Sequence, residues 1–319
     1  MAHKFILFVL FTSVVNSGEV DHYLSWGHSL EDASSILNTK VNEIIDSTLH
    51  TIPNDCSCEM AAGKVLSGFG INLNSILEQW IKNTDKIDKF MPNIDLALRE
   101  SIFSDHQSNH PQLDRAFFSI QVDEIINIGG IYVGLDKLTH FTGSGFLYYK
   151  AYITSKKMGF PSPFSSAIKV GIAGEKTIIG RMATGVFSYG DLEANFQGFR
   201  FALDMCNGDT PYLKFAKNRW IFSKKLDLLD YVNPNWDESY NPSFYFDGPN
   251  LMLKPKSTTV LKNLPFYCAQ YETDYVKKLF TYYDSIYTAS DSKIYLDSLI
   301  LIDKIPNPIQ FDIKQICSE

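Results

Sequence analysis

The segment 168–198 constrains the fold more than any other stretch, because it combines helical periodicity with an isolated acid. Its first part reads IKVGIAGEKTIIG, and Glu175 is the one carboxylate in it. At helical spacing the face of Glu175 is shared by apolar or small residues, namely Ile168, Gly171, Ile172, Ile178 and Ile179. Burial raises the pKa of a carboxyl group, and a general acid needs a raised pKa near neutral pH. Glu175 is therefore the first candidate for chemistry, with a structural ion pair to Lys176 or Arg181 as the alternative.

Apolar residues repeat at helical spacing along most of the chain, which predicts a mainly α fold with a few short strands. Of the 319 residues, 45% are hydrophobic and 20% are charged, as in a globular protein with a sizeable core. One compact helical domain is expected over residues 18–248, with a C-terminal extension, residues 249–319, packed on it. Helices are predicted over 29–52 with Ser29 as N-cap, 60–69, 71–81, 95–103, 134–158, from after the Pro161 and Pro163 connection to near 180–185, from Ser188 to about 206, and 274–287.

The regions between these helices are predicted to be loops, turns and short strands. Residues 105–114 are polar and predict a loop, and Gly129-Gly130 predicts a turn. Residues 231–250 are rich in Asn, Pro, Tyr and Asp, which predicts an irregular surface loop at one edge of a groove. Strand character is confined to short pieces such as 250–254 and 258–261.

The N-terminus predicts export. Lys4 precedes an apolar run over residues 5–15, and Val15 and Ser17 are suitably small for the end of a cleavage site. The run is too short to span a bilayer, and no later apolar stretch is long enough. Residues 1–17 are therefore predicted to be a cleaved signal peptide. The mature protein is expected to be secreted or periplasmic, without a membrane partner.

The cysteines suit an oxidising compartment, where some should form disulfides. Their number is odd, which leaves at least one unpaired or bonded to another chain. Cys56 and Cys58 are too close for an ordinary disulfide loop, so each is expected to bond elsewhere. No second Cys or His pair accompanies them, which disfavours zinc, and no cofactor is expected. The five are Cys56, Cys58, Cys206, Cys268 and Cys317.

Charge and motif content exclude several function classes. The net charge is −7 and no basic tract is present, so nucleic acid is not an expected partner. The chain lacks a G-x-S-x-G elbow and a phosphate-binding glycine loop, which argues against a nucleophilic serine hydrolase and a nucleotide enzyme. The 17 Tyr and 23 Phe suit carbohydrate-stacking surfaces as well as a large core, and the core is the commoner use.

The motif Ser188-Tyr189-Gly190-Asp191 has two interpretations. Serine at the N-cap and aspartate three residues later form a capping arrangement at the start of a helix. Asp191 is also a candidate for the second carboxylate of a glycosidase pair with Glu175. In such a pair, the separation of the two carboxyl groups decides between retention and inversion.

Asp136 and His140 lie four residues apart on one predicted helix face. This spacing suits half of a metal site, or a histidine that a carboxylate holds in one tautomer. No third ligand is indicated by the spacing. The structural pair is therefore favoured, and no metal is predicted.

Three stretches together resemble a family of exported bacterial proteins: YVGLDKLTHFTGSGFLYYKAY, GEKTIIGRMATGVFSYGDLEANFQGFRF and VNPNWDESYNPSFY. They resemble the deacetylation-specific lysozymes, which are similar in fold to goose-type lysozymes and lytic transglycosylases. The resemblance covers roughly residues 132–245 and implies a lysozyme-like helical fold. It also implies a muramidase acting on peptidoglycan that has lost its N-acetyl groups. The glutamate of the E-K-x-x-x-G run, here Glu175, would be the acid, and Ser188, Tyr189 and Asp191 would lie near the cleft wall and the substrate.

The main hypothesis is a monomeric, exported glycoside hydrolase whose partner is the peptidoglycan glycan strand. Glu175 would protonate the glycosidic oxygen, assisted by Asp191 or by a water that Ser188 and Tyr189 hold. The second hypothesis is a non-catalytic envelope protein that binds glycan or a partner, with Glu175 as a buried structural acid. It would be favoured by a Glu175 that is enclosed, salt-bridged and without a cleft beside it. The third, a metal hydrolase built on Asp136 and His140, requires a third ligand.

Overall fold

The structure is a computed structural model that describes residues 18–70, 75–248 and 255–318, without the side chains of 117–121 and 178. It is 58% helical with few short strands, which confirms the mainly α fold. The helices are α2 (Ser34–Leu49), α3 (Cys58–Ser67), α4 (Ile76–Lys82), α5 (Ile94–Glu100), α6 (Pro111–Gln121), α7 (Leu135–Thr139), α8 (Gly145–Lys157), α9 (Pro163–Lys176), α10 (Tyr189–Asp204), α11 (Lys256–Tyr271), α12 (Asp274–Ile286), α13 (Asp291–Leu301) and α14 (Ile313–Ile316). Two π-helical turns are η4 (His140–Ser144) and η5 (Ile178–Met182).

The described strands pair into three two-stranded antiparallel sheets. The pairs are β1 (Ile125–Ile128) with β2 (Ile131–Gly134), β3 (Val186–Phe187) with β6 (Phe244–Tyr245), and β4 (Leu213–Ala216) with β5 (Arg219–Phe222). Gly129 and Gly130, with φ of 63° and 86°, form the predicted turn between β1 and β2. Lys217 and Asn218 turn the β4–β5 hairpin at positive φ without any glycine, and the sequence analysis did not predict it.

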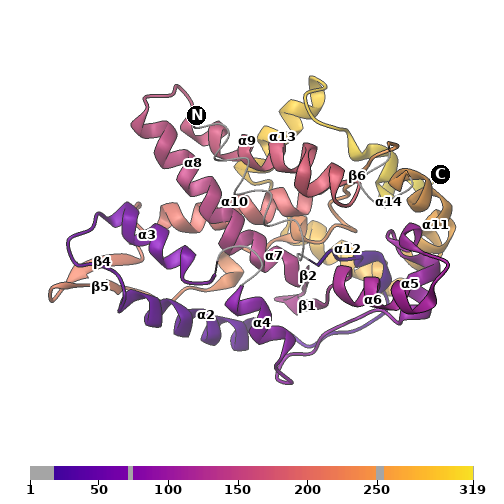
Figure 1. Cartoon of the computed structure of the whole chain (residues 1–319), viewed down its shortest axis with the longest axis horizontal. Coiled ribbons are helices and arrows are strands. Elements are labelled where there is room, and N and C mark those ends of the chain that lie inside the picture. Colours follow the sequence, from indigo (N-terminus) through magenta and orange to yellow (C-terminus); the bar gives the residue numbers. More distant parts are fainter. Residues whose placement is uncertain (1–17, 71–74, 249–254, 319) are drawn as a thin grey trace.

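Helices α8, α9 and α10 pack side by side, and α9 and α10 carry Glu175, Asp191 and Asn195, which are considered below (Figure 1). Glycine makes this packing possible. A Cβ atom on Gly145 would lie 2.8 Å from the Cα of Gly198, and a Cβ atom on Gly198 would lie 1.7 Å from the carbonyl oxygen of Phe141. The helix predicted over 134–158 is observed as an uninterrupted run of α7, η4 and α8. The close approach at Gly198 places the η4 turn directly against α10. Single π turns within α-helices frequently occur at functional sites.

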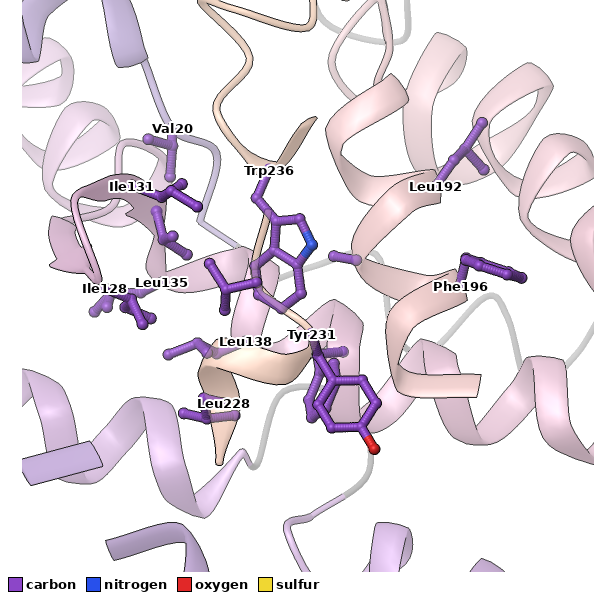
Figure 2. Packing of buried hydrophobic residues seen from close by; sticks show 14 of the residues in the cluster. Val20, Ile128, Ile131, Leu135, Leu138, Leu192, Phe196, Leu228, Tyr231 and Trp236 are labelled. Atoms are coloured by element: carbon purple, nitrogen blue, oxygen red, sulfur yellow. The ribbon is translucent and has the colours of Figure 1, made fainter. Parts of the chain in front are cut away.

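In its described part, residues 231–248, the segment predicted to be irregular is so, but it is not a surface loop. Trp236, at the end of the 3₁₀ turn η7 (Pro234–Trp236), is fully buried and lies 5.8 Å from the Phe141 ring. Figure 2 shows its indole among side chains that include Leu135, Leu138 and Tyr231. Polar neighbours can be buried here because they satisfy local backbone groups, as when Asp237 accepts the Ser239 N–H at 2.9 Å. The segment thereby carries Glu238 into the interior.

Three further predictions of local structure are wrong. Helix α2 begins at Ser34 and not behind a Ser29 cap, because the preceding residues are held against β1, where Ala33 N–H donates to Asn127. The predicted loop 105–114 contains the start of α6, whose first residue is Pro111, since proline suits the first position of a helix. The predicted strand 258–261 lies within α11, so the tertiary context overrides its β-branched composition.

Several predictions fall on residues that the structure does not describe. They are the signal peptide 1–17, the start of the predicted helix 71–81, the predicted strand 250–254, and the proposed start of the C-terminal extension at 249. Beyond that gap, Val260, Phe280 and Leu296 belong to the same hydrophobic core as the preceding helices. Within the described ranges, no helix is both long enough and apolar enough to cross a membrane.

Two disulfides tie distant helices together. Cys58–Cys206 links α3 to the end of α10, and Cys268–Cys317 links α11 to the end of α14. Cys56 has no disulfide partner in the described part of the chain. The expectation of disulfides is confirmed, but the expectation that Cys56 bonds elsewhere is wrong. The two bridges are compatible with an exported protein.

Candidate functional site

Four segments bring polar side chains into one group, called the buried polar cluster below. Strand β2 ends at Gly134 and leads directly into α7, where Leu135 and Leu138 face the core with no exposed surface. The intervening Asp136 and Lys137 therefore point to another side, toward the first turns of α10. The cluster consists of Asp136, Lys137, His140, Glu175, Ser188, Asp191, Asn195 and Glu238.

Lys137 is the hub of the buried polar cluster. Its side chain is 1% exposed, and its Nζ lies 2.6 Å from Asp136 Oδ2, 2.7 Å from Asp191 Oδ1 and 2.8 Å from Glu238 Oε1. A buried lysine needs such partners because an unpaired ammonium loses its hydration. One positive charge thus faces three carboxylates. Burial, together with the charges of Asp191 and Glu238, raises the pKa of Asp136 to about 8, although Lys137 opposes the rise.

Glu175 lies in the last turn of α9, inside this cluster, and is 3% exposed. Its Oε2 accepts the Ser188 N–H at 3.1 Å. Gly180 in η5 leaves room for the carboxyl group, since a Cβ atom there would lie 2.6 Å from the same oxygen. Burial raises the pKa of Glu175 well above its usual value, and the negative charge of Asp191 adds to the rise.

The structural ion pair considered for Glu175 does not form among the described residues. Lys176 Nζ instead contacts the carbonyl oxygen of Lys304, and the Arg181 guanidinium lies 5.0 Å from the Phe246 ring. Glu175 is enclosed, as the structural interpretation requires, but it has no cationic partner in the described part of the chain. Burial and the charge of Asp191 raise the pKa of Glu175 although the charge of Lys137 lowers it.

Asp191 takes part in two interactions. Its backbone belongs to the N-cap interaction of α10, and its side chain belongs to the ionic network around Lys137. Its N–H donates to Ser188 Oγ at 2.9 Å, which confirms Ser188 as the N-cap of α10. Its carboxylate contacts Lys137 and also lies 3.3 Å from His140 Nε2. Burial alone would raise the pKa of Asp191, but His140 and Lys137 outweigh burial and lower it.

Ser188 and Tyr189 are both buried, in different surroundings. Ser188 Oγ donates to Glu238 Oε1 and so connects the cap of α10 to the segment after Trp236. The Tyr189 hydroxyl donates to the carbonyl oxygen of Pro306, near the C-terminal end of the chain. Ser188 thus belongs to the buried polar cluster, whereas the hydroxyl of Tyr189 binds elsewhere.

The Asp136–His140 pair gains the third neighbour that the spacing did not indicate. One ligand atom each from Asp136, His140 and Asp191 lies within 4.8 Å of the others. His140 Nδ1 lies 2.9 Å from Asn195 Oδ1, so the ring is held from its other side. Asp191 joins this group because α10 crosses beside η4, an arrangement that helical periodicity cannot show.

Sequence reasoning missed Lys137, Asn195 and Glu238 as members of the site. The sequence could have indicated Lys137, because a lysine between two leucines that face the core needs an acidic partner if its charge is buried. Asn195 lies one helical turn after Asp191, so it shares that helix face. Glu238 carried no such signal, because its segment has no periodicity.

The site reaches solvent at its edge. The His140 side chain is 12% exposed, and Glu19 is half-buried, with a pKa raised by burial and by the charges of Asp191 and Asp136. Three hollows of the surface lie away from the buried polar cluster. The largest, of about 910 Å³, lies between α3 and α8 and is lined by residues such as Met60 and Phe146. The cleft expected beside Glu175 is not among these three.

Comparison of the chain with protein-family models, with curated proteins and with solved structures finds no match in any of the three.

Proposed function

We propose that this protein is a glycoside hydrolase that cleaves the glycan strand of peptidoglycan, with Glu175 as the general acid. The observation that carries the proposal is a buried Glu175 without an ion pair in the described part of the chain, in the same cluster as an Asp191 that contacts Lys137 and His140. Burial and the charge of Asp191 raise the pKa of Glu175, whereas His140 and Lys137 lower the pKa of Asp191 against the effect of burial. A protonated and an ionised carboxyl group side by side are typical of glycosidase sites.

In the proposed reaction, Glu175 donates its proton to the glycosidic oxygen as the bond from that oxygen to the anomeric carbon breaks. A water molecule adds its hydroxide to the anomeric carbon, and its remaining proton returns to Glu175. Because Glu175 is 3% exposed, the proposed reaction requires the protein to open beside it to admit the sugar. The negative charge of Asp191 helps to raise the pKa of Glu175, which favours proton donation.

The charge of the site favours a cationic glycan as substrate. Three carboxylates share one lysine in the buried polar cluster, and the whole chain carries −7. Removal of N-acetyl groups leaves ammonium groups on the sugar, and these are attracted to such a site. The proposal therefore names N-deacetylated peptidoglycan as the preferred substrate.

The test compares Glu175→Gln with Glu193→Gln on deacetylated and acetylated peptidoglycan. Glu193 is a matched control, because it is 1% exposed on α10 and its hydrogen bonds go to Gln197, Asn233 and Ser290. Release of soluble fragments should fall by about 10²-fold or more in Glu175→Gln. It should persist in Glu193→Gln. Equal release by wild type and Glu175→Gln would overturn the assignment, and product masses would separate hydrolysis from transglycosylation.

A second candidate is a non-catalytic envelope protein that binds glycan or a partner. The small exposed fraction of Glu175 and the position of the three hollows favour it. Co-sedimentation of wild-type protein with peptidoglycan, with no fragment release at any pH from 5 to 8, would support this candidate over the hydrolase.

A further inference from the structure

Three potential metal ligands meet at the edge of the buried polar cluster. Asp136 and His140 come from successive turns of the α7–η4 run, and Asp191 comes from the first turn of α10. One ligand atom of each lies within 4.8 Å of the other two. Two carboxylates and one imidazole converging from two helices form a donor set that suits a divalent ion.

The orientation of His140 is the second observation. Asn195 Oδ1 can only accept a hydrogen bond, so the contact of 2.9 Å assigns the ring hydrogen to His140 Nδ1. In the neutral ring, Nε2 then presents a lone pair, and it lies 3.3 Å from the acceptor Asp191 Oδ2. Two acceptors at this distance repel unless a proton or a cation lies between them. A histidine held at one nitrogen by a hydrogen bond is also the usual arrangement of a metal ligand.

Asp136 has coordination capacity that the protein leaves unused. Its Oδ2 contacts Lys137, but its Oδ1 has no hydrogen-bond partner among the described residues, although the residue is only 3% exposed. A buried carboxylate oxygen without a partner is costly. Within the described ranges, Lys137 is the one lysine or arginine in contact with Asp136, Asp191 and Glu238. A bound cation would give Asp136 Oδ1 the partner that it lacks among the described residues.

We propose that Asp136, His140 and Asp191 bind one divalent transition-metal ion, with Asn195 orienting the histidine. The mixed oxygen and nitrogen donors favour Zn²⁺ or Mn²⁺ over Ca²⁺ and Mg²⁺, which prefer oxygen alone. The 12% exposed His140 side chain gives the ion a route from solvent. The proposed metal site shares Asp191 with the proposed hydrolase site, but Glu175 is not one of its ligands.

The test is a calorimetric titration of metal-free full-length protein with ZnCl₂ and with MnCl₂. All samples carry Cys56→Ser, so that the free thiol contributes no ligand. One equivalent of ion should bind. His140→Ala should abolish binding, and Asn195→Ala should weaken it about 10- to 100-fold. His110→Ala, which removes an exposed histidine, should bind as the parent does.

Circular dichroism of each variant shows whether it is folded. If His140→Ala does not fold, the test uses Asn195→Ala, in which all three proposed ligands are intact. The inference is overturned if the parent binds no stoichiometric ion, or if a folded His140→Ala or Asn195→Ala variant binds it unchanged. Because binding is read directly, its failure leaves the assignment of Glu175 untouched, and loss of hydrolase activity in Glu175→Gln leaves the metal site untouched.

Discussion

Replacing Lys137 with methionine tests whether one lysine holds the buried polar cluster together. Methionine preserves much of the side-chain length and removes the charge, leaving Asp136, Asp191 and Glu238 without the ammonium that lies 2.6–2.8 Å from each. Removing one partner of a buried ion pair costs about 3–5 kcal/mol. For a chain of 319 residues, that corresponds to a fall in Tm of about 4–8 °C.

A double-mutant cycle with Glu238→Gln separates the loss of the Lys137 charge from nonspecific destabilisation by the methionine side chain. In the Lys137→Met background, Glu238→Gln removes a negative charge that has lost its partner, so it should recover part of the stability. In the wild-type background it removes one ion pair and should destabilise. The coupling free energy from urea unfolding should exceed about 1 kcal/mol.

The matched control is Lys293→Met, which removes a single ion pair 2.5 Å long from a side chain that is 24% exposed. Its cost should be about 0.5 kcal/mol. The reasoning is refuted if Lys137→Met costs less than about 1 kcal/mol, or if its effect adds to that of Glu238→Gln within about 0.5 kcal/mol.

Two further predictions concern stability away from this cluster. Burial raises the pKa of Asp21 from 3.8 to about 6, so its contribution is fully present below the unfolded value and is lost as pH rises through 6. Relative to Asp21→Asn, the free energy of unfolding of the wild type should therefore fall by about 2 kcal/mol between pH 4 and pH 7, and an unchanged difference would contradict this. The Cys58–Cys206 bridge spans 148 residues and Cys268–Cys317 spans 49, so replacing each pair with serine should cost about 5 and about 4 kcal/mol in urea unfolding. A larger loss from the shorter loop would contradict the chain-entropy argument.

The helical part of the fold could be predicted from the sequence because its signals are local. The cap at Ser188, the Gly129-Gly130 turn and the helix 274–287 each depend on a few neighbouring residues, and the structure places them close to the predicted positions. The segment 231–250 was predicted to be irregular for the same reason. Its burial could not be predicted, because that depends on which elements surround Trp236.

The site was only partly predictable, since it is assembled between elements. Glu175 stood out because it interrupts an apolar stripe within one helix. The contact between His140 and Asp191 requires α10 to lie against η4, and this approach depends on Gly198 facing the carbonyl oxygen of Phe141. The sequence shows that glycine but does not show which backbone it meets.

The claim that Glu175 is a protonated acid at neutral pH can be measured directly. The measurement is the infrared difference spectrum between wild type and Glu175→Gln in the carboxyl region at pH 7. Burial and the charge of Asp191 predict a protonated carboxyl band in the wild type that is missing from the variant. A carboxylate band in its place would show that Glu175 is ionised at pH 7 and would contradict its role as the general acid.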